Sequence, residues 1–235
     1  DGAPFIKPEM EGAGSKSEPG QPDLPTMSTY YAVEPGKIFT INASIKESEV
    51  IENVEVVPFE TWNSQPTGVI EKGVTYQQSS SFPANIATVS DPMVFRDIVM
   101  VQVSVTPFQY NPVSKTLTVI QEIDLELVES GATEVPYIPQ QKSREFEILY
   151  ESLVVNYPST IREGEEVYQR PSILYVLPNN IGNLLGTVEE LMNWKKRVGF
   201  DVQYVSTSSI VNNRNNLKNY IEDAYETWEN PPVHV

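Results

Sequence analysis

Apolar and polar residues alternate with a period of two along the first half of the chain, which is the pattern of half-buried β-strands. Lys37–Ile45 and Val50–Val56 both show this alternation. The longest alternating segments are Phe95–Thr106 and Lys115–Val128, with the turn-forming residues 111–114 between them. These two segments are therefore predicted to form an antiparallel hairpin with one buried face.

Several alternating strands without a clear helical period predict a β-sandwich, jelly-roll-like in its connections, over residues 29–150. Residues 1–28 contain many Gly, Pro, Ser and Glu residues and are predicted to form an extended N-terminal arm. Residues 151–170 have no regular period, and we interpret them as a linker.

The last part of the chain, residues 171–235, has a different pattern. Ser172–Leu177 is a continuous apolar run, typical of a strand that is covered on both faces. Apolar residues then recur at helical spacing over 184–198 and over 217–228, and a second short strand, Asp201–Val205, lies between them. This order predicts a β-α-β-α-β unit with a parallel sheet.

Local signals place the ends of these elements. Thr187 and Glu190 are spaced as a capping box, and Gly199 is predicted to end the first helix. The prolines at 231–232 are expected to end the second helix, and residues 233–235 to begin a third strand. A sheet that stopped there would expose apolar edges, so we expect the natural polypeptide to continue.

The composition of the chain excludes or disfavours several kinds of partner and of catalytic site. The net charge of −16 and the pI of about 4.4 disfavour nucleic acid as a partner. The chain has no cysteine, which excludes disulfides and a thiol nucleophile within it, and its one histidine, His234, is interpreted as an ordinary residue at the start of a strand. No apolar run is long enough to span a membrane. The chain begins Asp1–Pro4 without a leader-like pattern, so a signal peptide is expected to be absent or removed.

Cofactor motifs are also missing from the sequence. There is no glycine-rich phosphate loop after Ser172–Leu177, so no nucleotide cofactor is expected. No D-x-D-x-D-G pattern marks a calcium loop, and the sequence leaves the question of a bound metal open.

Several motifs, in order, resemble the gingipain family of cysteine peptidases. The later part of the chain contributes Leu191–Phe200 and Leu217–Trp228, which resemble the beginning of the family's catalytic domain. The earlier part contributes Gly20–Pro25 and Thr106–Pro112, which resemble its β-rich prodomain. The resemblance covers nearly the whole chain.

This resemblance implies a caspase-like catalytic domain in which a Cys-His dyad cuts peptide bonds, in the known gingipains after Arg or Lys. The dyad would lie in sequence that this chain does not contain, so no catalytic residue is assigned here. The implied partners are the remainder of the protein's own catalytic domain and the peptide substrates of the mature enzyme. The implied location is outside a bacterial cell or on its surface.

A prodomain that blocks such a cleft needs a basic side chain in an accessible loop. Arg96 and Lys72 are the candidates, and we favour Arg96 because an irregular stretch precedes it. The alternative function is a non-enzymatic binding or adhesion module joined to a degenerate peptidase-like domain. A flavodoxin-like enzyme domain is disfavoured by the missing phosphate loop.

Overall fold

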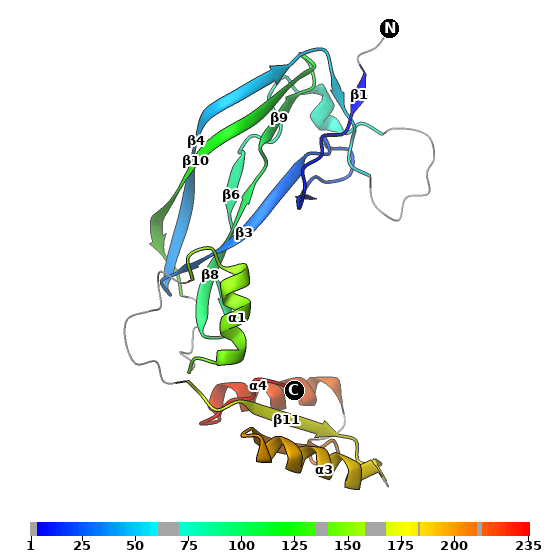
Figure 1. Ribbon diagram of the computed structural model, residues 1–235. Coiled ribbons are helices and arrows are strands. Elements are labelled where there is room, and N and C mark those ends of the chain that lie inside the picture. Colours follow the sequence, from blue (N-terminus) through cyan, green and yellow to red (C-terminus); the bar gives the residue numbers. More distant parts are fainter. Residues whose placement is uncertain (1–3, 61–70, 135–140, 158–167, 183, 211–212) are drawn as a thin grey trace. The chain divides into compact units, whose positions relative to one another are not determined.

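The computed structural model describes residues 4–60, 71–134, 141–157, 168–182, 184–210 and 213–235 (Figure 1). Contacts divide the chain into two compact units, residues 1–135 and 136–235, and each is described by itself. The described residues of the first unit form mostly antiparallel sheet, and the second contains a parallel pair of strands and helices.

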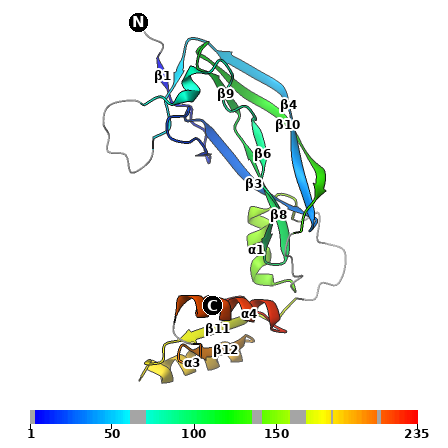
Figure 2. The same cartoon turned by 180° about the vertical axis from the view of Figure 1, so that it is seen from behind.

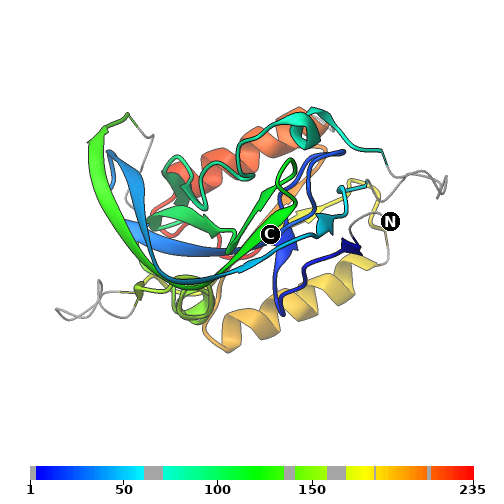
Figure 3. The ribbon, with the colours of Figure 1, turned by 90° about the horizontal axis from the view of Figure 1, so that it is seen from above.

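The first sheet of unit one is built around two long strands, β4 (Lys37–Ile51) and β10 (Thr116–Ala132), which are antiparallel. Figure 3 shows them side by side as a curved ribbon. Ile41 pairs with Leu127 and Ile45 with Ile123, so the apolar positions of the alternating pattern share one face. The short strand β9 (Phe108–Asn111) pairs with the beginning of β10.

The second sheet contains five strands in the described residues. Strand β8 (Ile98–Val105) pairs with β3 (Pro25–Val33) along one edge and with β6 (Ala87–Val89) and β7 (Met93–Phe95) along the other. Strand β2 (Gly14–Ser15) pairs with β3. Strand β8 is the most deeply buried, and Val101 has no exposed surface.

The predicted hairpin between Phe95–Thr106 and Lys115–Val128 is wrong, although both segments are strands. Strand β8 belongs to the second sheet, whereas β10 pairs with β9 and β4. Pro107 separates β8 from β9, and because proline has no N–H to donate to a ladder, the chain leaves one sheet there and enters the other. The tight hairpin therefore joins β9, rather than β8, to β10.

The N-terminal segment joins the core of the first unit. Strand β1 (Phe5–Ile6) pairs in parallel with β5 (Glu55–Val56), and a single turn of 3₁₀-helix, η1 (Val74–Gln77), lies in the segment that follows residue 70. Leu24 is 1% exposed and packs in the main cluster with Val56 and Tyr110. Residues 22–26, predicted as part of an extended arm, are thus buried; the proposed boundary at residue 28 stays a prediction.

The first described helix of the second unit was not predicted from the sequence. Helix α1 (Arg144–Leu153) follows Ser143 and lies where a sandwich end and a linker were expected. Its one buried residue is Tyr150, whose ring centroid lies 5.2 Å from that of Tyr157. The domain limits at 150 and 170 stay a proposal.

The predicted β-α-β order of the second unit is confirmed. Strands β11 (Ser172–Leu177) and β12 (Asp201–Ser206) are parallel, with Leu174 opposite Gln203. Figures 1 and 2 show α3 (Leu184–Arg197) and α4 (Arg214–Thr227) on opposite sides of this pair.

The helix ends follow local rules with one exception. Gly199 has a φ of +103° and ends α3, as predicted, because this left-handed conformation costs glycine little. The predicted capping box at Thr187 is wrong, since α3 begins at Leu184 and Thr187 lies inside it. Asn213 caps α4, accepting a hydrogen bond from the N–H of Asn216 at 2.9 Å.

Candidate functional site

Lys72, one of the two predicted inhibitory residues, lies just before η1 and is held by its surroundings. Its ammonium forms an ion pair with Glu55 and lies 5.0 Å from the ring centroid of Phe5 and 5.4 Å from that of Tyr76. The backbone beside it is fixed as well, because the N–H of Gly73 donates to the carbonyl of Gly20 at 2.8 Å. Lys72 therefore links segments that are far apart in the sequence.

Glu55 is the centre of this cluster. It also pairs with Lys115, whose Nζ lies 2.7 Å from Oε1. Lys115 first and Lys72 second hold the pKa of the Glu55 carboxyl below its ordinary value of 4.5. Burial raises the pKa of Tyr76, whose hydroxyl donates to the carbonyl of Val56 at 2.7 Å. These contacts stabilise the packing of β1, β5 and η1.

Arg96, the other predicted inhibitory residue, lies in the turn that joins β7 to β8. Phe95 pairs with Ile98, so only Arg96 and Asp97 form the turn. The φ of Arg96 is +57°, a conformation that tight hairpin turns require, and its Nε lies 3.9 Å from Oδ1 of Asp97. The structure therefore places Arg96 at the tip of a hairpin, and does not bring it together with Lys72 in one cluster.

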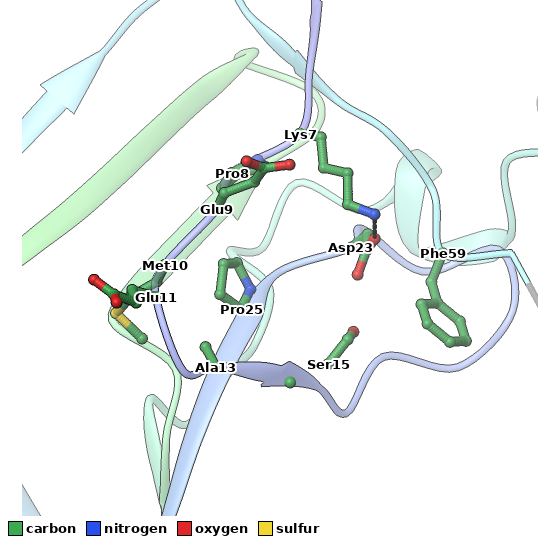
Figure 4. Close-up of a pocket in the computed structure, with 11 residues that line it drawn as sticks. Lys7, Pro8, Glu9, Met10, Glu11, Ala13, Ser15, Asp23, Pro25 and Phe59 are labelled. Atoms are coloured by element: carbon green, nitrogen blue, oxygen red, sulfur yellow. Dashed lines mark ion pairs between the residues drawn. The ribbon is translucent and has the colours of Figure 1, made fainter.

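An open hollow of about 620 Å³ lies beside the N-terminal segment (Figure 4). Lys7 reaches across it, and its Nζ lies 3.1 Å from Oδ2 of Asp23. The Asp23 side chain is 11% exposed, whereas that of Lys7 is 60% exposed. Phe59 and Pro25 border the same hollow. The ion pair joins Lys7 of the N-terminal segment to Asp23, next to the buried Leu24, and was not predicted from the sequence.

In the second unit, a buried polar group joins the beginning of β11 to the segment after α4. The hydroxyl of Ser172 donates to the carbonyl of Pro231 at 2.6 Å and accepts from the N–H of Val233 at 3.0 Å. The N–H of Leu174 donates to the carbonyl of His234 at 2.9 Å, and Ile173 forms a parallel bridge with His234. At the position of the predicted third strand the structure has one isolated parallel bridge beside β11, to which His234 contributes its backbone.

The catalytic chemistry implied by the resemblance is not assembled in this chain, which has no cysteine. Within the described ranges, no group of three or more His, Cys, Asp or Glu side chains is arranged to hold a metal ion. Over the same residues, none of the helices combines the length and the apolar composition needed to cross a membrane.

Comparison with known proteins gives two adjoining family matches. Residues 2–174 match the family Propeptide_C25, and residues 167–235 match Peptidase family C25. The first match covers most of the chain, including α1, and the second covers the part of the second unit that contains β11, β12, α3 and α4. The order of the two families is that of a propeptide followed by a peptidase.

Two curated relatives agree with these matches. Gingipain R2 of Porphyromonas gingivalis (strain ATCC BAA-308 / W83) is 26% identical over 235 residues, covering 93% of this chain and 31% of the relative. Gingipain R1 of Porphyromonas gingivalis is 27% identical over 229 residues, covering 93% of this chain and 22% of the relative. The chain thus spans a third or less of the length of these relatives.

A solved structure supports the same assignment. The chain resembles one described as a complex of Porphyromonas gingivalis RgpB pro- and mature domains, with a TM-score of 0.51, 30% sequence identity, and coverage of 63% of this chain and 77% of the other. The non-enzymatic binding module is accordingly not favoured. The chain belongs to the gingipain-like C25 cysteine peptidases, of which it spans a propeptide and the beginning of the peptidase region.

Proposed function

We propose that this chain is the inhibitory or folding-assisting prodomain of a secreted cysteine endopeptidase zymogen, together with the first part of its catalytic domain. The observation that carries the proposal is the order of the two family matches, a propeptide over 2–174 and a peptidase over 167–235. In this proposal the Cys-His dyad is supplied by sequence outside the chain, so residues 1–235 have no peptidase activity of their own.

The finer fold assignment is part of the same proposal. Two antiparallel sheets within the first unit support a jelly-roll-like sandwich for the prodomain. Parallel β11 and β12, with a helix on each side, support a caspase-like α/β unit for the peptidase region. The partners are then the rest of the catalytic domain and, after activation, peptide substrates, and the zymogen acts outside the bacterial cell or on its surface.

The prodomain masks the cleft with a basic side chain if the mature enzyme prefers Arg or Lys. Arg96 stays the favoured candidate over Lys72, because an irregular stretch precedes it and it lies in the two-residue turn of a hairpin. Its side chain is 6% exposed beside Asp97, whereas that of Lys72 is 37% exposed and is held by Glu55 and two aromatic rings. Either residue would have to leave contacts within the prodomain to enter a cleft, and breaking such contacts has a cost in free energy.

The test is inhibition of the mature enzyme by the whole 235-residue chain, compared among the wild type, Arg96→Ala and Lys72→Ala. A charge-assisted contact in a water-excluded pocket is worth a few kcal/mol, so Arg96→Ala should weaken inhibition by roughly a hundredfold. Lys46→Ala is the matched control, because Lys46 pairs with Asp124 on exposed strands. Equal inhibition by all four chains would reject the plug, and no inhibition by the wild type would reject the masking function itself.

A further inference from the structure

One basic side chain of the first unit, Lys16, differs from the others in its hydrogen-bond partners. In residues 1–135 the acidic residues outnumber the basic ones by 19 to 7. Within the described part of this unit, every lysine and arginine except Lys16 lies within ion-pair distance of a carboxylate. Lys16 instead donates to neutral oxygens, at 2.6 Å to Oγ of Ser104 and at 3.3 Å to Oε1 of Gln102. Its positive charge is therefore not neutralised by a neighbouring acid.

Hydroxyl groups surround this lysine on neighbouring strands. Ser104 on β8 is 4% exposed, and its hydroxyl lies 2.9 Å from that of Ser28, the residue paired with it on β3. Next to them, the hydroxyls of Thr26 and Thr106 lie 2.7 Å apart. Hydroxyl hydrogens rotate, so such groups can turn a donor toward an incoming anion. The positive charge of Lys16 and several hydroxyl donors that can reorient thus lie close together.

A small hollow of about 130 Å³ opens beside these groups. Lys16, Thr26, Ser104 and Thr106 line one part of it, while Leu24, Phe82 and Ile86 line another. The hollow is large enough for a group of a few non-hydrogen atoms and combines an end lined by a lysine and hydroxyl groups with an apolar wall. The strongly negative charge of the unit repels anions in general, so binding here depends on the local contacts.

We propose that this hollow is a binding site for a short aliphatic carboxylate, either a free acid or the end of a larger molecule. The carboxylate accepts hydrogen bonds from Lys16 and from the hydroxyl of Ser104, and the aliphatic part lies against Leu24, Phe82 and Ile86. The site lies between β2, β3 and β8, so occupancy links the segment around Lys16 to the second sheet and stabilises the folded state.

The test uses the whole chain, with butyrate as the probe and butyramide as its neutral isostere. Titrations followed by amide NMR should give saturable shifts near Lys16 and Ser104 with butyrate and none with butyramide. Lys16→Gln should weaken butyrate binding about tenfold or more, since one charge-assisted contact is lost. Lys46→Gln removes the same charge at an exposed ion pair and should leave the affinity unchanged.

Two further measurements make the assignment specific. Ser104→Ala keeps the lysine but removes the buried hydroxyl, and should weaken binding severalfold while the spectrum of the unliganded chain outside the hollow is retained. Inorganic phosphate should bind more weakly than butyrate, because it cannot use the apolar wall. Equal binding of butyramide, tighter binding of phosphate, an equal loss in Lys46→Gln, or the absence of saturable shifts would each overturn the proposal.

Discussion

Replacing Leu24 by alanine tests whether the N-terminal segment is part of the core. The Leu24 side chain is 1% exposed and packs with Val54, Val56, Tyr110 and Leu117. Truncating a fully buried leucine removes its transfer free energy and leaves a cavity, which costs about 2–5 kcal/mol in the free energy of unfolding. An unanchored arm would instead lose almost nothing.

The loss in the free energy of unfolding can be measured for the first unit alone by hydrogen exchange on peptides from β9 and β10. When reclosing is faster than exchange, a loss of about 2 kcal/mol speeds the slowest amides roughly 30-fold. Met27→Ala, three residues further along the chain, is the control, because Met27 is 50% exposed, and it should change the free energy of unfolding by less than about 0.5 kcal/mol. Equal exchange rates in Leu24→Ala and the wild type would refute the placement of Leu24 in the core.

Three further substitutions test other contacts. Glu55→Gln should lower the stability of the first unit by roughly 1 kcal/mol at neutral pH; because the pKa of Glu55 is held below 4.5 in the folded state, the difference from the wild type should vanish in unfolding titrations as the pH falls through that lowered pKa. A Cβ at Gly73 would lie 2.9 Å from the backbone oxygen of Gly20, so Gly73→Ala should lower the melting temperature, whereas Gly14→Ala, with nothing within 4 Å, should not. Ser172→Ala removes two buried side-chain hydrogen bonds, although the carbonyl of Pro231 keeps Gln169 and the N–H of Val233 keeps the carbonyl of Ser172, so it should cost about 1 kcal/mol in chemical unfolding of the second unit; an unchanged midpoint would contradict the hydrogen-bond assignment.

The strands of the first unit could be predicted from the sequence, but their pairing could not. Period-two alternation depends only on which face is buried, so the segments that form β8 and β10 were located correctly. Lys37–Ile45 and Val50–Val56, predicted as two strands, are instead the long strand β4 (Lys37–Ile51) and the short strand β5 (Glu55–Val56). Choosing the partner of β10 required knowing that the chain changes sheets at Pro107, which local pattern does not reveal. The ion pair between Lys72 and Glu55 could not be predicted either, because the two residues are 17 positions apart and no spacing rule connects them.

The second unit was more predictable because its signals are local. Ser172–Leu177 reads as a buried strand, and Gly199 marks a helix end, from neighbouring residues alone. Helix α1 was missed because it is only ten residues long and lies in a stretch with Pro136, Pro139 and Pro158 that was interpreted as irregular. The Lys16 hollow was also missed, since its hydroxyl groups come from strands that meet only in the folded sheet.

The most direct test of the account is whether residues 1–235 keep the longer protein latent. The rate of cleavage of Arg- or Lys-containing peptides should be low for the intact full-length protein, rise after cleavage between its pro- and peptidase regions, and fall again when the separate 235-residue chain is added. The chain alone should show no turnover, because it lacks cysteine. Full activity of the uncleaved protein, together with no effect of the added chain on the mature enzyme, would contradict the assignment of a latency-maintaining prodomain.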